Sequence, residues 1–267
     1  MAETAEKKEA PKKKPSGAAA LALLGIAVGT PQTSPDNKTA LIYGPPGSGK
    51  TRFASSASEV EELGRVLLVD VEAGSASIEN VYTENIDVAR PTDYAELKQV
   101  IEFVLNEEHD YGTIIIDTVG KMMEFMEKEF DKRNSKNAYE KWALLAEDTL
   151  KWTELLHRSG LFVILLAHTD SDKDDTTGKV STFPYFLGKK TGKEAPKIFD
   201  IIGYLYVDKH PETGDPLRVL QTEGVDGKVA KDRTDTLPNY MGNPLMSKVY
   251  NRIKGGVIGK PDAVPGE

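Results

Sequence analysis

The fold is decided by the stretch TALIYGPPGSGKT, residues 39–51, in which a short apolar run leads into a glycine-rich loop. From Gly44 to Thr51 this loop matches the pattern G-x-x-x-x-G-K-[ST], and a helix-compatible segment follows it. Glycines let successive backbone N–H groups converge on phosphate oxygens, and the amino end of the next helix adds a favourable dipole. The pattern therefore predicts a strand, a phosphate-binding loop and a helix, in that order.

This phosphate loop (Gly44–Thr51) predicts binding of ATP together with Mg²⁺. We expect Lys50 to reach the β- and γ-phosphates and the Thr51 hydroxyl to bind the magnesium ion. A phosphate loop alone does not distinguish a hydrolase from a kinase, so residues at other strand ends must decide. The residues expected to contact the nucleotide are Gly44, Pro45, Pro46, Gly47, Ser48, Gly49, Lys50, Thr51 and Arg52.

Composition and charge narrow the class of protein. In 267 residues, 34 Lys and Arg stand against 42 Asp and Glu, so the net charge is −8 and whole-molecule attraction to nucleic acid is not expected. Any such binding must come from a local patch. The absence of cysteine excludes disulfides and zinc sites built on sulfur. No apolar run approaches the roughly 20 residues of a membrane span, so we expect no membrane partner.

The chain is expected to form one domain between two tails. Residues 1–37 begin with a charged stretch rich in Lys, Glu and Pro, which is typical of disorder. An apolar segment at 18–29 follows and resembles a secretory signal in layout, but acidic residues in the charged stretch and the nearby phosphate loop disfavour that interpretation. We expect the segment to pack on the domain edge, with docking on a neighbouring subunit as the alternative. From residue 38 to 254, apolar strands alternate with helical stretches, which predicts an α/β fold with a mostly parallel sheet flanked by helices. Residues 255–267 are rich in Gly and Pro and are expected to form the second tail.

Periodicity places the expected elements along this domain. Trp142 and Trp152 share one face of the last helical stretch, so we expect both in the core. The expected strands are 39–43, 66–70, 113–117 and 161–167, with weaker patterns at 201–207 and 217–222. The expected helices are 51–62, 93–106, 119–131 and 138–158.

Three of the expected strands lead into polar side chains. Asp117 ends an apolar run and is expected to hold the metal through its water shell. Glu72 follows the second strand, and His168 ends the fourth. Because ligands of parallel sheets bind at the carboxyl ends of the strands, we expect all three near the phosphate loop. Simpler alternatives remain open: a solvated loop charge for Glu72, and a capping or surface residue for His168.

These elements together resemble RecA-fold ATPases, in which a strand followed by Asp-x-Glu precedes a Walker B strand ending in Asp-Thr or Asp-Ser. The resemblance covers about residues 38–235 and looks closest to phage-type RecA-core ATPases of single-strand annealing and recombination. It implies a RecA-like P-loop fold in which Glu72 is the general base that polarises the attacking water and Asp70 is a structural neighbour. His168 would sense the γ-phosphate from a position where that family often has Gln.

A further match is the tripeptide Lys231-Asp232-Arg233. It has the Lys-x-Arg form that RadA-like recombinases and DnaB-type helicases insert into the active site of the adjacent subunit. The resemblance therefore implies a homo-oligomer, ring or filament, in which Lys231 and Arg233 neutralise charge in the transition state. Any exposed loop can contain Lys-x-Arg, so a plain surface role stays open.

The segment 169–197 is long for a loop without a function. Its first part is acidic, whereas its second part interleaves aromatic residues with lysines, a mixture suited to stacking the bases of single-stranded DNA. In RecA-like proteins the loop after the sensor strand contacts DNA; a lid or a solvated loop is the alternative. The expected DNA-binding residues are Phe183, Tyr185, Phe186, Lys189, Lys190 and Lys193, with Lys132, Arg133 and Lys136 in a second cluster.

Four functions fit these features. The first is a cytoplasmic ATPase, in the host cytoplasm if a phage encodes it, that oligomerises on single-stranded DNA in annealing or recombination. The second is a helicase-like or packaging motor. The third is a small-molecule kinase, which Glu72 and the lack of arginine in residues 169–193 disfavour. The last is a regulatory protein that binds ATP without hydrolysing it.

Overall fold

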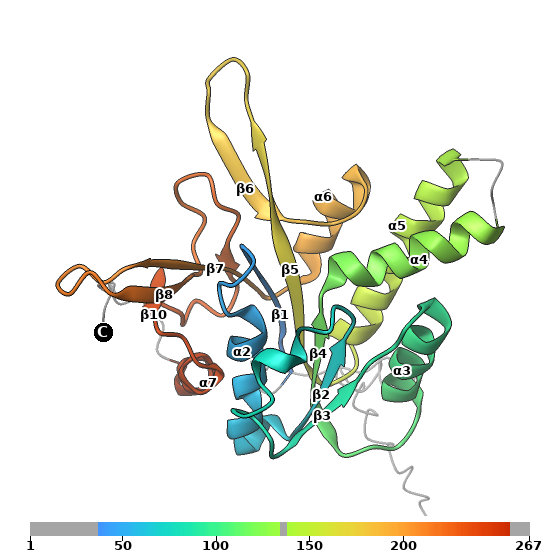
Figure 1. Cartoon of the computed structure of the whole chain (residues 1–267), viewed down its shortest axis with the longest axis horizontal. Helices are drawn as coiled ribbons and strands as arrows, with labels where there is room; N and C mark the ends of the chain where they lie inside the picture. The colour runs from blue at the N-terminus through green and yellow to red at the C-terminus, as the bar shows by residue number, and fades with distance from the viewer. Residues whose placement is uncertain (1–36, 134–137, 257–267) are drawn as a thin grey trace, which may run out of the picture. The chain divides into compact units, whose positions relative to one another are not determined.

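The computed structural model describes residues 37–133 and 138–256 (Figure 1). Within these residues a single sheet has the strand order β10-β8-β7-β1-β5-β4-β2-β3, with β6 paired to β5 and β9 paired to β7. The predicted tails over 1–37 and 255–267 lie almost wholly outside the described residues. The strands are β1 (Thr39–Gly44), β2 (Arg65–Asp70), β3 (Ile86–Ala89), β4 (Tyr111–Asp117), β5 (Phe162–Lys173), β6 (Val180–Pro184), β7 (Ile201–Lys209), β8 (Pro216–Gln221), β9 (Lys231–Asp232) and β10 (Tyr240–Gly242).

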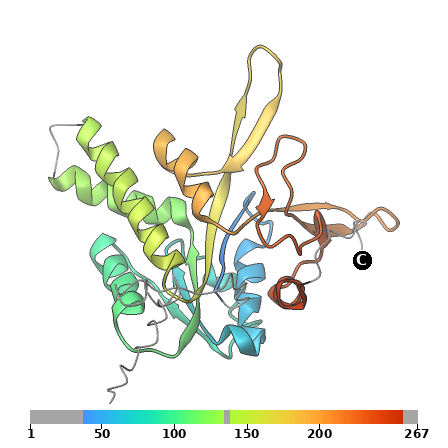
Figure 2. The same ribbon diagram turned by 180° about the vertical axis from the view of Figure 1, so that it is seen from behind.

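Helices cover both faces of this sheet (Figures 1 and 2). No helix within the described ranges is long and apolar enough to cross a membrane. The helices are α2 (Lys50–Ser55), α3 (Tyr94–Asn106), α4 (Val119–Arg133), α5 (Ala138–His157), α6 (Lys189–Ile198) and α7 (Met246–Gly255), with 3-10 turns at Ser56–Glu59, Glu61–Leu63 and Gly74–Ser77.

The central part of the sheet is parallel. The strands β3, β2, β4, β5, β1 and β7 are parallel neighbours, whereas β8, β9 and β10 pair antiparallel. The predicted α/β fold with a mostly parallel sheet flanked by helices is therefore confirmed. Because β5 lies between β1 and β4, Gly44 at the end of β1, Asp117 at the end of β4 and His168 within β5 come to one edge.

The core consists of two layers, one on each face of the sheet. Side chains alternate along β1, so that Leu41 and Tyr43 face one layer while Ala40 and Ile42 face the other. The first layer also contains apolar side chains of α3, α4, α5 and α6, and the second contains those of α2 and α7. This two-sided burial explains why the central strands are nearly continuous apolar runs.

Local sequence explains where two helices begin. The N-cap residue Asp93 accepts a hydrogen bond of 3.0 Å from the Glu96 backbone N–H through its side chain, and the Glu96 side chain accepts one of 2.8 Å from the N–H of the preceding Thr92, so both bonds hold the first turn of α3. The helix α2 begins directly after Gly49, whose φ of +96° disfavours any residue but glycine. The phosphate loop thus ends at the amino terminus of a helix, as predicted.

The helix expected at 51–62 is only partly correct. The α-helix α2 ends at Ser55, and 3-10 turns occupy Ser56–Glu59 and Glu61–Leu63. The Ser56 hydroxyl donates to the Phe53 carbonyl at 2.6 Å, and the Ser58 hydroxyl to the Ser55 carbonyl at 2.9 Å. Serine hydroxyls that bond to nearby backbone carbonyls compete with the helical pattern.

Two further expectations were wrong. The segment 169–197 is no irregular loop: β5 continues to Lys173, turns back through β6 as a hairpin, and leads into α6 (Figure 1).

Trp152 is buried as expected, but Trp142 is 40% exposed, and the Lys141 ammonium nitrogen lies 4.9 Å from the centroid of its ring. A helical face predicts burial only where another element covers it, and the first turns of α5 are less covered than its last.

Candidate functional site

The phosphate loop depends on its glycines. Gly47 and Gly49 have φ angles of +76° and +96°, a region that L-residues rarely adopt. Gly44 meets a different limit, because a Cβ atom there would lie 2.0 Å from the Leu205 carbonyl oxygen. The loop after β1 is therefore held in a conformation that other residues could not form without strain.

Lys50 is buried inside this loop. Its ammonium donates hydrogen bonds of 2.9 Å to the Gly44 carbonyl and 3.0 Å to the Pro45 carbonyl. Burial lowers the pKa of Lys50, and the negative charges of Asp117 and Glu72 oppose that shift. The loop thus holds one partly desolvated cation at its centre, where it can bind phosphate oxygens.

Thr51 and Asp117 form the expected metal pair. The Thr51 hydroxyl donates to Asp117 Oδ2 at 2.5 Å, and only 4% of Asp117 is exposed. Burial raises the pKa of Asp117, and the nearby carboxylates Glu72 and Asp70 add to this, while the Thr51 hydrogen bond opposes it. One carboxylate and one hydroxyl fit Mg²⁺, which takes few protein ligands and keeps several of its waters. We propose these two side chains as its protein ligands.

Glu72 and His168 lie in contact. The Glu72 side chain, 29% exposed, has its two oxygens 3.2 and 3.1 Å from His168 Nε2. Glu72 Oε1 also accepts a hydrogen bond of 2.6 Å from the Thr118 hydroxyl. Thr118, joined to Asp117 by a cis peptide bond, was not predicted as a site residue. The general-base and sensor candidates therefore form one hydrogen-bonded group with Thr118.

Asp70 fixes the turn that follows Glu72. Its fully buried carboxylate accepts hydrogen bonds from the Gly74 N–H at 2.8 Å and the Ser75 N–H at 3.0 Å, and the Arg90 Nε lies 3.9 Å away. Gly74 in turn lies against the metal pair, since a Cβ atom there would be 3.5 Å from Asp117 Oδ2. Asp70 thus positions the segment that carries Glu72.

The phosphate loop, the metal pair and the Glu72–His168 pair line one pocket of about 380 Å³, a size suited to a small-molecule site. Arg218 of β8 also lines it, and the sequence offered no motif that would have identified this residue. The pocket is lined on its polar side by Lys50, Thr51, Arg52, Glu72, Asp117, Thr118, His168 and Arg218.

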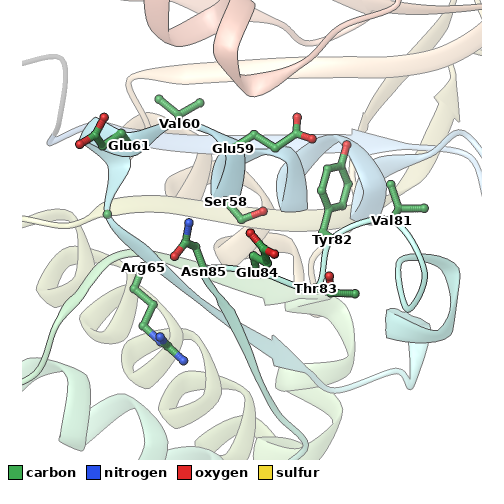
Figure 3. A pocket seen from close by; sticks show the side chains of 11 residues that line it. Ser58, Glu59, Val60, Glu61, Arg65, Val81, Tyr82, Thr83, Glu84 and Asn85 are labelled. Atoms are coloured by element: carbon green, nitrogen blue, oxygen red, sulfur yellow. The ribbon is translucent and has the colours of Figure 1, made fainter.

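A larger pocket of about 690 Å³ lies elsewhere (Figure 3). It lies at the amino ends of β2 and β3, where Figure 3 shows Glu59, Glu84 and Arg65 among its lining residues. Arg65 is already paired with Asp87 at 2.6 Å. Ligands of open parallel sheets bind at the carboxyl ends of the strands, so the smaller pocket is the candidate active site.

Lys231 and Arg233 contact their own chain. The Lys231 ammonium donates to the Pro196 carbonyl at 2.9 Å, and Arg233 donates to the carbonyls of Lys197 and Ile198. These are the last carbonyls of α6, which cations stabilise through hydrogen bonds and the helix dipole. Insertion of either side chain into a neighbouring subunit stays a prediction, and it would require release from α6.

The lowered pKa of Lys231 predicts that the free energy of unfolding depends on pH. Burial, with the charge of Arg233 adding to it, lowers the pKa of Lys231 from 10.5 to about 8. Between these values the unfolded chain binds the proton that the folded chain has released, so the free energy of unfolding rises with pH. Denaturant titrations at about pH 7 and about pH 10 should show the wild type gaining stability relative to Lys231→Met. An unchanged difference between the two proteins would contradict this assignment.

The expected DNA-binding residues differ in how far their side chains are exposed to solvent. Phe186 is 7% exposed and belongs to the core layer beneath α5 and α6, so its assignment to base stacking was wrong. Phe183 and Tyr185 are half-buried, while Lys132 and Lys190 are exposed. Arg133 lies at the end of α4, Lys189 and Lys193 lie in α6, and Lys136 is outside the described residues.

Comparison with known proteins gives one family match. A family described as an AAA domain matches residues 36–234. No curated protein matches the chain. Among solved structures, RadB recombinase is 19% identical, with 76% of this chain and 84% of that chain covered and a TM-score of 0.42. A KaiC-like protein from the archaeon Pyrococcus horikoshii is 14% identical, with 69% and 77% covered and a TM-score of 0.39.

Proposed function

Because the chain belongs to the AAA domain family, we propose that it binds ATP with Mg²⁺ and hydrolyses the β–γ phosphoanhydride bond. Its P-loop ATPase fold is of the RecA type predicted from the sequence, with β5 inserted between the phosphate-loop strand β1 and the Asp117 strand β4. The assignment to the phage-type group stays a prediction.

The observation that carries the proposal is the convergence of Lys50, Asp117 and Glu72 on one pocket. Binding alone would need only the phosphate loop and the metal pair. Glu72 adds a carboxylate whose position is fixed by Thr118 and His168, and a general base must be held in this way to act on water. A carboxylate so placed favours hydrolysis over simple binding.

In the proposed reaction, each residue has one task. Lys50 would bind the β- and γ-phosphates, and Thr51 and Asp117 would hold a magnesium ion, which would supply positive charge beside these phosphates. The oxygen of a water molecule attacks the γ-phosphorus while Glu72 accepts a proton from that water. The bond between the γ-phosphorus and the oxygen that bridges it to the β-phosphorus breaks. The products are ADP and inorganic phosphate. His168, through its contact with Glu72, would report the state of the γ-phosphate to β5 and its hairpin.

We further propose that the ATPase acts on single-stranded DNA as a homo-oligomer. Support comes from the resemblance in the sequence and from the exposed Lys132 and Lys190. The hairpin of β5 and β6 is a poorer candidate, because Asp170, Asp172, Asp174 and Asp175 outnumber its two lysines. The DNA surface would therefore involve α4 and α6, and not the tip of the hairpin.

The test is ATP turnover with and without single-stranded DNA, together with particle size by light scattering. We expect DNA to raise turnover several-fold and to shift the particle size from small to large species in the presence of ATP. Salt should weaken the effect, because phosphate contacts release counterions. A monomer whose ATP turnover is unchanged by DNA would contradict the proposed action on DNA, but not the proposed ATP hydrolysis.

A further inference from the structure

Arg218 reaches the phosphate loop from a distant part of the sequence. It lies on β8, and its side chain lines the pocket together with Gly47, Gly49 and Lys50. A Cβ atom on Gly49 would lie 2.7 Å from Arg218 Nε and 3.2 Å from its Cδ. Glycine at position 49 therefore does two things: it allows the φ of +96° and it leaves room for the arginine.

The backbone of Arg218 is firmly held. Its neighbours Leu217 and Val219 are 3% and 1% exposed, and its position pairs with Val207 in the β7–β8 ladder. The Arg218 carbonyl also accepts a hydrogen bond of 2.7 Å from the Asn243 N–H. A fixed backbone of this kind limits where the exposed side chain can reach, and the phosphate loop lies within that reach.

The guanidinium of Arg218 has no hydrogen-bond or ion-pair partner in the part of the chain that the structure describes. Lys231 and Arg233, by contrast, are bound to α6. Lys50, the cation at the loop centre, is bound to the Gly44 and Pro45 carbonyls. A planar group with five donors therefore lies beside a loop that predicts phosphate binding, and its geometry matches that of a phosphate.

We propose that Arg218 binds the α- and β-phosphates of the nucleotide within its own chain. The sheet order places β8 on one side of β1 and β2, the strand that precedes Glu72, on the other, so Arg218 approaches from the side away from the general base. Gly49 belongs to the part of the loop whose N–H groups cradle the α- and β-phosphates. Arg218 therefore acts on nucleotide binding, which distinguishes it from a cation supplied by a neighbour to the γ-phosphate.

This inference rests on the proposed nucleotide site, and binding measurements can separate the two. In titrations of the full chain with Mg²⁺, we expect Arg218→Ala to bind ATP and ADP each roughly 10- to 100-fold more weakly, the usual effect of losing a charged hydrogen bond. Inorganic tripolyphosphate, used as a competitor, should lose affinity to a similar extent. Arg218→Lys should recover part of the loss, and turnover should change more in KM than in kcat.

Arg252→Ala, which removes an exposed arginine of α7, serves as the matched control and should bind like the wild type. Unchanged ATP binding by a folded Arg218→Ala would overturn the inference alone. Weaker ATP binding with unchanged tripolyphosphate binding would place Arg218 on the base and also overturn it, as would a loss of kcat with unchanged ADP affinity. A wild type that binds neither ATP nor tripolyphosphate would overturn the proposed function itself.

Discussion

Replacing Lys50 by alanine is expected to abolish ATP turnover, with a loss of at least roughly 100-fold, the scale on which an enzyme depends on a single buried group that stabilises charge. The ammonium is the cation held at the centre of the phosphate loop, by the carbonyls of Gly44 and Pro45. Alanine leaves the β- and γ-phosphates without that charge. Steady-state phosphate release measured at saturating Mg²⁺ and ATP tests the expectation.

The control for this variant is Lys151→Ala, which removes an exposed lysine of α5 far along the chain from the loop. It should keep wild-type turnover. Circular dichroism and thermal unfolding should show that Lys50→Ala is still folded, because the loop carbonyls that lose the ammonium can accept hydrogen bonds from water. Turnover by Lys50→Ala within a few-fold of the wild type would mean that the phosphate loop is not the catalytic site.

The second large effect is expected for Glu72→Gln. The amide has nearly the same shape and can still interact with Thr118 and His168, but it cannot accept a proton from water. We expect turnover to fall about 100- to 10,000-fold, the usual contribution of general acid–base catalysis, while ATP binding is retained. Single-turnover phosphate release and nucleotide titration together separate the two quantities.

Glu79→Gln provides the comparison, since Glu79 is an exposed carboxylate seven residues further along the same segment. It should hydrolyse ATP at the wild-type rate. If Glu72→Gln also did so, Glu72 would be the solvated loop charge that the sequence left open as its alternative. If Glu72→Gln lost ATP binding as well, its main role would be to shape the pocket.

Much of the fold could be predicted because its signals are local. The strands β1, β2 and β4 and residues 162–167 of β5 are apolar runs buried on both faces, and the glycine pattern after β1 identifies the phosphate loop. Parallel strands of one sheet share an edge, so residues at strand ends could be predicted to meet. Glu72, Asp117 and His168 were brought together by that rule alone.

The remaining features depend on contacts between distant segments. Phe186 follows a hairpin and is buried under helices that its own sequence does not indicate. Arg218 reaches Gly49 only because β8 folds back along β7, and Lys231 reaches α6 only because β9 pairs with the same strand. None of these pairings leaves a short-range pattern, so the arginine in the pocket was missed and the aromatic residue was assigned to the wrong surface.

The most direct test of the central claim is release of inorganic phosphate from ATP by the purified wild-type chain, measured beside Lys50→Ala and with and without Mg²⁺. We predict phosphate release that requires Mg²⁺, exceeds that of Lys50→Ala by at least roughly 100-fold and produces one ADP per phosphate. A wild type that binds ATP tightly and yet releases no more phosphate than Lys50→Ala would contradict the account and identify the chain as a nucleotide-binding protein without hydrolytic activity.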